Sequence, residues 1–496
     1  MLMKMAGLAV ILFSEKWNAL VPSMPISPEA AMRFPVALGG AATCFAIFLL
    51  GRELFGPAVA LIASLLWTVN INTVALSRIA KEDALATLFF VLANYFLLRG
   101  KRLHWEDPLK AKKSYLATGA SFGLMFASKY LLPYTWSTLV YYDILRFRRE
   151  PRWRIDRKTR YQIFGCLVAV FLLVNPISVL PSVWEHNWLQ FTQQRITHIG
   201  YVMMDQIRMN KAIYTLWGVP FYYYPLYLFV KTPIPSLIAF VIGLIYTIRR
   251  YKDDRFLFLG MFFLLWIFLL SLAGGKFTRY AITFMPAVVL FEALGIYIVY
   301  SASAAFLKKR GVQSTSIVLF VLLMITAGWQ LFLNRLYYPI PSLYVSSQGG
   351  GEKRMGYYFP QDDFYDVGLR ETIHFLCDTA PKKSVVLGIT PAAFQYYQTR
   401  YGRPDLEFVA VPTDRQDFQP AQNHYLIIQD YRQYLETSYM LTFARAELNP
   451  IFVSSVKGKI SVELYLLARR APFAKSPYWR SKNWPGLLLP LSQVAK

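Results

Sequence analysis

Cysteine, histidine and acidic side chains are scarce in this sequence. Its 496 residues include three cysteines, five histidines and 29 acidic residues against 53 lysines and arginines. Two of the cysteines, Cys44 and Cys166, lie in apolar runs, so a disulfide framework is excluded. No CxxC or His-rich spacing indicates a metal site, and no Gly-rich loop indicates a bound nucleotide. The chain also lacks an obvious cleavable signal peptide and a repeat of about 20–50 residues.

Apolar residues, in contrast, are abundant. The chain is 55% hydrophobic and 17% aromatic, with a mean hydropathy of +0.33. Several runs reach the roughly 20 apolar residues that a helix needs to cross a bilayer. The runs are continuous rather than alternating, which favours helices over membrane strands. The sequence therefore predicts an α-helical polytopic membrane protein.

The net charge of +24 would suit a nucleic-acid partner, but its distribution argues against one. The basic residues gather in short links between apolar runs, which stay cytoplasmic under the positive-inside rule. Such links also favour anionic lipid headgroups, so membrane lipids rather than nucleic acid are the expected partners. The links are Arg99–Lys113, Arg146–Arg160, Arg249–Arg255 and Lys308–Arg310.

These basic links orient about ten predicted spans. Counting from them, residues 77–83, the link 129–130, the segment 184–220 and the link 273–279 all lie on the external face. The second of these lies between two short runs, Ser114–Ser128 and Leu131–Leu145, which could be tilted or partly re-entrant. The predicted spans are Phe34–Leu50, Pro57–Leu76, Ala84–Leu98, Ser114–Ser128, Leu131–Leu145, Tyr161–Leu180, Phe221–Ile248, Phe256–Leu272, Tyr280–Tyr300 and Thr315–Phe332.

The composition changes after about residue 334. Short β-like runs alternate with helical patterns, which predicts a small external α/β domain over residues 335–471, followed by a tail, 472–496. Residues 34–334 form the predicted transmembrane domain, and residues 1–33 an interfacial helix and an external loop. Asp366 is the expected N-cap of the helix Asp366–Cys377. The other expected elements are Ser384–Ile389, Pro391–Thr399, Glu407–Val411, Tyr425–Gln429, Ile451–Val456 and Val462–Leu467.

The charged cluster Ser77–Asp83 is the main candidate site. It places Arg78, Lys81, Glu82 and Asp83 between two apolar runs, where charges are costly and usually functional. The alternative is an ordinary polar loop between two helices. Other charged features are expected at the same face: Lys129-Tyr130, the segment with His186, Arg195, His198 and Asp205, and Gly274–Tyr280, which contains Lys276 and Arg279.

Cations beside a bilayer suit the phosphate of a lipid, and a nearby carboxylate suits general-base work. Each residue also has a simpler interpretation. Lys129 and Lys276 could extend from helix ends toward water, and Arg279-Tyr280 could cap a helix. His198 could serve packing, and Glu82 could be a solvated neighbour of Asp83. The joint placement of these residues on one face favours a phosphate site.

Several motifs resemble a known family. The series Arg33-Phe34-Pro35, Gly51–Gly56 and Ser77–Asp83 is similar to GT-C membrane glycosyltransferases, above all the dolichyl-phosphate-mannose protein mannosyltransferase and aminoarabinose transferase-like group. Resemblance covers roughly residues 30–335. Further matching segments are Gly275–Tyr280 with Pro286, His198–Tyr201, Gly218–Pro220, Val230–Pro233 and, less diagnostic, Gly356–Pro360 with Tyr365-Asp366.

The resemblance implies a GT-C fold and an inverting transfer of one sugar from a polyprenyl-phosphate carrier to an acceptor, without a nucleotide; metal dependence stays open. It implies a multi-pass cell-membrane protein, with a bacterial inner membrane and a periplasmic tail as the expectation. Asp83 and Glu82 would be the catalytic carboxylates, and Tyr130 and His198 would line the acceptor cavity. The expected ligands of the donor phosphate are Arg78, Lys81, Lys129, Lys276, Arg279 and Tyr280.

Alternatives and one departure from the family remain. A lipid-linked sugar flippase or other transporter is the rival, although no inverted repeat is visible. An oligosaccharyltransferase is a third possibility, but its W-W-D-Y-G signature is missing. The family's main carboxylate, in a first external loop, has no counterpart here, and Met1–Phe13 resembles the interfacial helix that follows that loop. We therefore expect a truncated start, with an upstream span and carboxylate. The sugar and the acceptor stay open.

Overall fold

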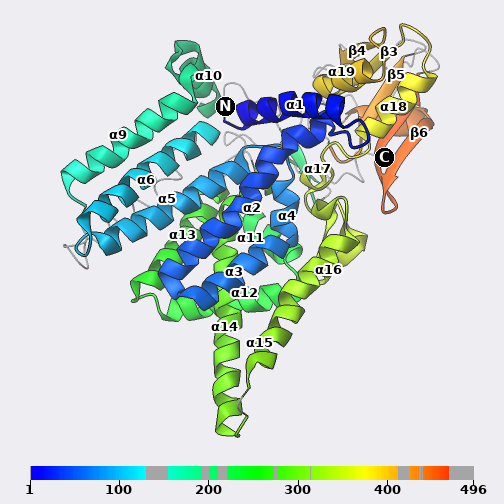
Figure 1. Ribbon diagram of the computed structural model, residues 1–496. Coiled ribbons are helices and arrows are strands. Elements are labelled where there is room, and N and C mark those ends of the chain that lie inside the picture. The colour runs from blue at the N-terminus through cyan, green and yellow to red at the C-terminus, as the bar shows by residue number, and fades with distance from the viewer. Residues whose placement is uncertain are drawn as a thin grey trace. The chain divides into compact units, whose positions relative to one another are not determined.

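The computed structural model describes residues 2–129, 155–192, 200–204, 206–209, 220–272, 276–312, 314–411 and 424–467, apart from 433, 435, 436 and 438 (Figure 1). The chain divides into two compact units, and each is described by itself below. The first comprises Met1–Thr192, Tyr222–Leu272 and Phe277–Glu352. The second comprises Gln193–Phe221, Ala273–Lys276 and Lys353–Lys496.

The first unit is helical. Proline occupies one of the first two positions of several of its helices, where its missing N–H costs nothing. In the part that the structure describes, the helices are α1 (Leu2–Leu20), α2 (Pro28–Phe55), α3 (Pro57–Val69), α4 (Ile71–Ser77), α5 (Asp83–Leu103), α6 (Pro108–Ser128), α9 (Arg157–Val174), α10 (Pro181–Phe191), α11 (Tyr223–Lys231), α12 (Ile234–Arg249), α13 (Asp254–Leu272), α14 (Met285–Lys309), α15 (Ser316–Leu323) and α16 (Trp329–Leu336), with short turns of 3₁₀-helix between some of them.

Five described helices are long and apolar enough to cross a membrane, and a sixth span results if the bent pair α3–α4 counts as one. They are α2, α5, α13, α14 and the continuous run Ser316–Leu336, in which α15 and α16 are joined by the π-helical turn Met324–Gly328. The expected ten spans are therefore not confirmed. Several of the other helices carry charges in their first turns, as α6 does at Lys110, Lys112 and Lys113.

A bend of 59° separates α3 from α4 at Asn70, where the sequence analysis predicted one straight span. The Asn70 side chain accepts hydrogen bonds from the backbone N–H groups of Asn72 and Thr73 and so begins a new helix. Gln330 on α16 accepts from the N–H of Ile71, and Asn334 donates to the carbonyl of Val69. Side chains thus replace the backbone bonds that the bend removes, as helix breaks in membranes require.

The predicted span Phe221–Ile248 is also divided in two. Helix α11 ends at Lys231 and α12 begins at Ile234, because Pro233 has no N–H to continue the first helix. Helix α12 then packs closely on α14. A Cβ at Gly243 would lie 1.9 Å from the Phe291 carbonyl oxygen, and one at Gly295 would lie 2.0 Å from the Ala239 oxygen. Only glycine allows these two backbones to approach so closely.

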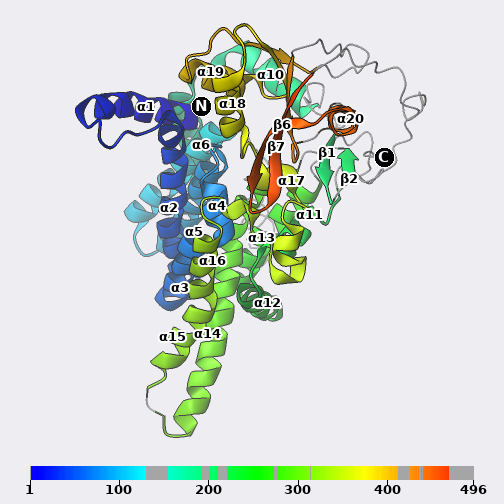
Figure 2. The same ribbon diagram turned by 90° about the vertical axis from the view of Figure 1, so that its right-hand side faces the viewer.

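Further helices of the first unit pack as neighbours. Helices α5, α6 and α9 lie side by side (Figure 1), and α14 lies beside α15 in both views (Figures 1 and 2). Helix α1 continues to Leu20, so the helix expected at Met1–Phe13 is longer than predicted. The charged and polar residues after Phe13 do not end it. Its side chain Asn18 makes two hydrogen bonds with the backbone of Ile26, which fixes the turn into α2.

The second unit contains a hairpin and a mixed sheet. The hairpin pairs β1 (Gly200–Met203) with β2 (Gln206–Met209). The sheet has the strand order β4-β3-β5-β7-β6, in which β4, β3 and β5 are parallel and the other pairs antiparallel. Its strands are β3 (Val385–Gly388), β4 (Glu407–Ala410), β5 (Tyr425–Gln429), β6 (Pro450–Val456) and β7 (Lys459–Leu466), and its helices are α17 (Pro360–Phe364), α18 (Leu369–Thr379), α19 (Pro391–Arg400) and α20 (Tyr439–Glu447).

Both faces of this sheet are covered by apolar side chains. On one face, Val386 and Ile427 pack with residues of α18 and α19, such as Leu376 and Phe394. On the other face, Leu426 and its neighbours pack with α20. The inner strands β3 and β5 are hydrophobic because both of their faces are buried. The alternation of strands and helices beyond residue 384, expected from the sequence, is present.

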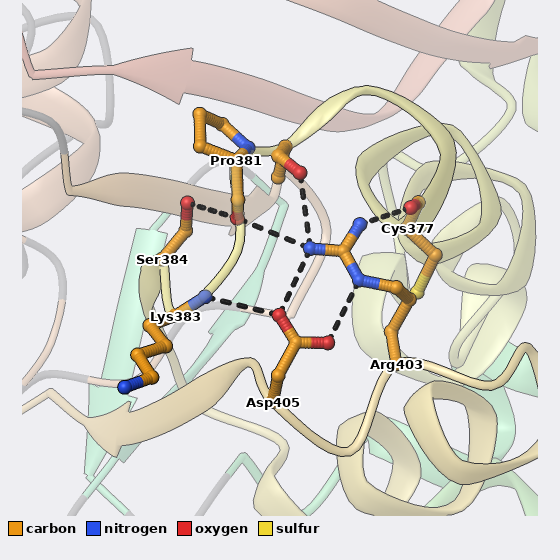
Figure 3. A network of polar contacts seen from close by, with 7 residues as sticks. Cys377, Pro381, Lys383, Ser384, Arg403 and Asp405 are labelled. Atoms are coloured by element: carbon orange, nitrogen blue, oxygen red, sulfur yellow. Dashed lines mark hydrogen bonds and ion pairs between the residues drawn. The ribbon is translucent and has the colours of Figure 1, made fainter.

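One polar network joins α18 to the starts of β3 and β4 (Figure 3). Arg403 donates to the carbonyls of Cys377, Ala380 and Pro381 and pairs with Asp405. The guanidinium thus satisfies carbonyls at the C-terminal end of α18, where helices leave acceptors without partners. Asp405 in turn accepts from the N–H of Lys383.

The expected N-cap of α18 is wrong. The cap position is Gly368, whose φ of +88° is a left-handed conformation that glycine adopts readily, and α18 begins one residue later. Asp366 lies two residues before the cap. It accepts a hydrogen bond from Gln429 and pairs with Arg432 instead. These partners come from β5 and the residues just after it, far along the sequence.

Candidate active site

The charged turn predicted between two helices is present. Helix α4 ends at Ser77, and α5 begins at Asp83 with Glu82 as its N-cap residue. Asp83 therefore lies in the first turn of a 21-residue helix, where the helix dipole favours a negative charge. Its backbone carbonyl accepts a hydrogen bond from the Thr87 hydroxyl. The carboxylate is thus fixed by the helix and is 3% exposed.

Two cations hold this carboxylate. Lys129 Nζ donates to Asp83 Oδ1 in a short contact, and Arg279 Nε lies 3.4 Å from Oδ2. Lys129 directly follows α6, as its C-terminal cap residue, and Arg279 lies in the 3₁₀-helix Thr278–Thr283 (η4). Their side chains are only 14% and 16% exposed. Three elements far apart in the sequence thus bring two positive charges and one negative charge together.

Aromatic rings form a cradle for both cations. Lys129 Nζ lies 3.9 Å from the centre of the Tyr280 ring. The Arg279 guanidinium lies 3.9 Å from the Phe277 ring centre and 5.1 Å from that of Tyr280. Ring faces attract cations, and they do so more strongly where water is excluded. Phe277 was missed by the sequence analysis. Its position two residues before Arg279 indicates a ring–cation contact only when the conformation of the turn is known.

The net charge of this cluster is +1, from two cations and one carboxylate. Arg279 Nε is too far from Oδ2 for a strong hydrogen bond, and within the described residues Oδ2 accepts none. The contact between Arg279 and Asp83 is therefore an ion pair without a strong hydrogen bond. An anion with a single negative charge would bring the site to neutrality, which is the charge balance that a partly buried site requires.

Lys276 is a further cation in the same loop sequence. It lies between α13 and η4 and is 2% exposed. Burial lowers the pKa of its ammonium group to about 8. A lysine with such a pKa carries its charge at neutral pH and loses it in mildly alkaline solution.

The remaining predicted residues lie at or beyond the edge of the cluster. Arg78 does not pair with Asp83, because its guanidinium donates to the carbonyl of Pro339 at 2.6 Å and lies near the Tyr338 ring. Lys81 is exposed and Glu82 is partly buried. Tyr130 and His198 fall outside the described residues, so their expected place in an acceptor cavity stays a prediction.

The described part of the chain holds no group of three or more His, Cys, Asp or Glu side chains able to bind a metal ion. The described residues bring Asp83, Lys129 and Arg279 together within an aromatic cradle. This arrangement can hold a phosphate beside cations and rings and can support charge that develops on a departing phosphate.

Comparison with known proteins identifies a related family. Residues 19–179, which include Asp83 and Lys129, match the family of dolichyl-phosphate-mannose-protein mannosyltransferases. The resemblance expected from the sequence is thereby confirmed over these residues. No curated protein matches the sequence.

Solved structures with low sequence identity resemble the chain over most of its length. ArnT from Cupriavidus metallidurans bound to undecaprenyl phosphate has 13% identity and a TM-score of 0.46, with 90% of this chain and 85% of that chain covered. The Archaeoglobus fulgidus oligosaccharyltransferase tethered with an acceptor peptide has 11% identity and a TM-score of 0.47. There the match covers 91% of this chain and 65% of the other.

Proposed function

We propose that the chain transfers one sugar from a polyprenyl-phosphate carrier to an acceptor at the external face of the membrane. The observation that carries this proposal is the Asp83–Lys129–Arg279 cluster with its net charge of +1. The phosphodiester of a polyprenyl-phosphate sugar carries one negative charge, which the cluster neutralises. The name of the matching family, dolichyl-phosphate-mannose-protein mannosyltransferase, specifies a donor of this kind.

The transfer needs one bond to form and one to break. An acceptor nucleophile bonds to the anomeric carbon and gives up its proton, while the bond from that carbon to the phosphate oxygen breaks. The oxygen leaves with the electron pair, so the phosphate gains charge. Lys129 and Arg279 would stabilise this added charge, because preorganised cations act most strongly in a partly buried site.

Asp83 would position the two cations rather than take the proton. Both of its oxygens face a positive charge, so this carboxylate is already paired with the cations that it would hold in place. Glu82, next in sequence and partly buried, is the other carboxylate of the turn and a candidate base. The phosphate would take over part of the bonding of Lys129 and Arg279 as it binds.

The external placement has a separate support. Asp83 begins α5, and Lys101 and Arg102 lie in its last turn. A helix of this length spans roughly 30 Å, about the thickness of the hydrocarbon core. Basic residues favour the cytoplasmic side, so the opposite end with Asp83 would be external.

An Asn449→Cys variant would test the side of the α/β unit. We expect an impermeant thiol reagent to label it in intact cells, and labelling only after lysis would reverse the topology.

Transfer itself is tested with purified protein and a radiolabelled polyprenyl-phosphate sugar. We expect release of the sugar from its lipid, strongly reduced in Lys129→Gln and Arg279→Gln. Arg102→Gln is a matched control, because its exposed guanidinium pairs with Glu53 at 2.5 Å at the other end of α5. Loss of activity in the control as severe as in Arg279→Gln would assign these effects to folding.

The rival is a transporter of lipid-linked sugars. The broken pair α3–α4 next to the charged turn favours it, since transporters build their sites on interrupted helices. Movement of the labelled lipid across vesicles with its sugar bond intact, in the presence of candidate acceptors, would support transport. Cleavage that depends on Lys129 and Arg279 would support transfer.

A further inference from the structure

A second cluster of polar side chains lies in the α/β unit, at the carboxyl ends of its parallel strands. From β3 the chain passes to β4 on one side, while β5 pairs with β3 on the other. The connections therefore diverge between the ends of β3 and β5. In open α/β sheets, ligands bind in the crevice at such a switch point.

The side chains at this point form a connected set. Gln429, the last residue of β5, is 4% exposed. Its amide donates to Asp366 Oδ1 at 3.0 Å and accepts from the Thr390 hydroxyl at 3.3 Å. Arg432 also donates to Asp366 Oδ1 and, through Nε, to the Tyr434 hydroxyl. The buried glutamine thus anchors an ion pair that reaches the surface.

Each member of that ion pair keeps one polar atom for a ligand. Both protein donors reach the same oxygen of Asp366, and within the described residues Oδ2 accepts no hydrogen bond. Likewise Nη2 of Arg432 has no partner among these residues. The side chains are 46% and 26% exposed, so both atoms can meet solvent. A fixed acceptor and a fixed donor therefore lie beside each other.

The backbone before Asp366 is strained. Tyr365 has φ 50° and ψ −123°, a conformation that costs a residue with a side chain about 1–3 kcal/mol. It ends α17 and turns the chain so that Asp366 faces the switch point. Phe364, the residue before Tyr365, stacks on the ring of Tyr431. The two ring centres are 3.8 Å apart and the ring planes differ by 8°.

We propose that this switch point is a binding site for a neutral saccharide. Adjacent hydroxyl groups of a sugar each donate and accept, which matches the free Oδ2 of Asp366 and Nη2 of Arg432. An anion fits poorly, because Asp366 neutralises Arg432 and its free oxygen would repel negative charge. The site lies in the α/β unit and does not depend on the transfer reaction proposed for Asp83.

The test is saturation-transfer NMR on the full chain in detergent, with neutral hexoses and a hexose disaccharide as probes. We expect transfer to at least one of these saccharides, and an affinity about tenfold lower in Asp366→Asn and Arg432→Gln, which each remove a charge-assisted hydrogen bond. Asp378→Asn is the matched control, because it removes an exposed carboxylate of α18 paired only with His374 at 3.7 Å. It should leave saccharide affinity unchanged.

The Arg279→Gln variant separates this site from the transfer site, since it should lose donor binding and keep saccharide binding. Loss of saccharide binding in Arg279→Gln would place the sugar at the transfer site and overturn the proposal. No transfer to any saccharide probe would overturn it as well, as would binding of inorganic phosphate that displaces the sugar. Equal thermal melting of Asp366→Asn and the natural protein shows that any loss of affinity is not unfolding. If Asp366→Asn has a lower melting temperature than the natural protein, Thr390→Val must show the same loss of saccharide affinity while it remains folded.

Discussion

Replacement of Asp83 by asparagine should have two opposite effects, one on stability and one on ligand binding. The change is nearly isosteric and removes one negative charge. Lys129 and Arg279, 14% and 16% exposed, then lose their common partner. Removal of one partner of a buried ion pair costs about 3–5 kcal/mol. Because both cations retain some contact with solvent, we expect a loss near about 3 kcal/mol, seen as a lower melting temperature in detergent.

Binding of the lipid phosphate should change in the other direction. The charge of the cluster rises from +1 to +2 when Asp83 becomes neutral. One additional unit charge about 4 Å from a phosphate contributes about 4 kcal/mol at an effective dielectric constant near 20, before the cost of removing water. A remaining gain of about 1.4 kcal/mol would tighten binding about tenfold. Turnover should fall, since the cations lose the carboxylate that positions them.

The assay is a titration of the purified variant with polyprenyl phosphate, together with melting curves in its absence and presence. Saturating ligand should restore most of the lost stability in Asp83→Asn, because the phosphate replaces the missing charge. Lys110→Gln is the control, since its ion pair with Asp107 is exposed and worth about 0–1 kcal/mol. Weaker phosphate binding in Asp83→Asn than in the natural protein would refute this account of the cluster.

Three further predictions concern single residues. Burial lowers the pKa of Lys276 to about 8, so the KM for the donor should rise as the pH passes through 8. In Lys276→Arg the KM should not change over this pH range. If the variant shows the same rise in KM as the natural protein, Lys276 does not bind the donor. Arg403→Ala should destabilise the α/β unit by about 2–3 kcal/mol, because the charged hydrogen bonds of Arg403 are lost. Thermal melting measures this loss, and Arg400→Ala, at an exposed position, is the control. Equal melting temperatures of the two variants would contradict the network's role. Burial beside Glu463 raises the pKa of Asp430 to about 7. The folded chain then keeps a proton that the unfolded chain releases near pH 4, so stability should fall as the pH rises from about 4 to 7, and less steeply in Asp430→Asn.

Local signals in the sequence located much of the fold. The strand Tyr425–Gln429 was expected with the bounds that the structure shows, because a short apolar run next to polar residues has few other conformations. The charged turn before α5 was expected because four ionisable residues interrupt two apolar runs. Both features are determined by residues that are adjacent in the sequence, so they can be predicted without knowledge of the tertiary structure.

Long-range contacts account for what the sequence could not show. The straight span expected over Pro57–Leu76 is broken at Asn70, and the groups that support the break come from Gln330 and Asn334. Asp366 resembled an N-cap, but its partners Gln429 and Arg432 lie more than sixty residues away. Arg78 bonds the Pro339 carbonyl and not Asp83, while its expected contact with the donor phosphate stays a prediction. Such pairings are decided by packing and carry no local pattern.

The bend at Asn70 has a consequence for the order of events during synthesis. Asn70 can bond Asn72 and Thr73 as soon as these residues exist, but the N–H of Ile71 must wait for Gln330, 259 residues later. Until then, the elbow between α3 and α4 exposes backbone groups that lipid cannot satisfy. The insertion machinery must therefore shelter this elbow, or keep it at the water interface, while most of the helical unit is made. A ribosome halted before residue 330 should hold a membrane intermediate in which residues 69–71 remain accessible to water.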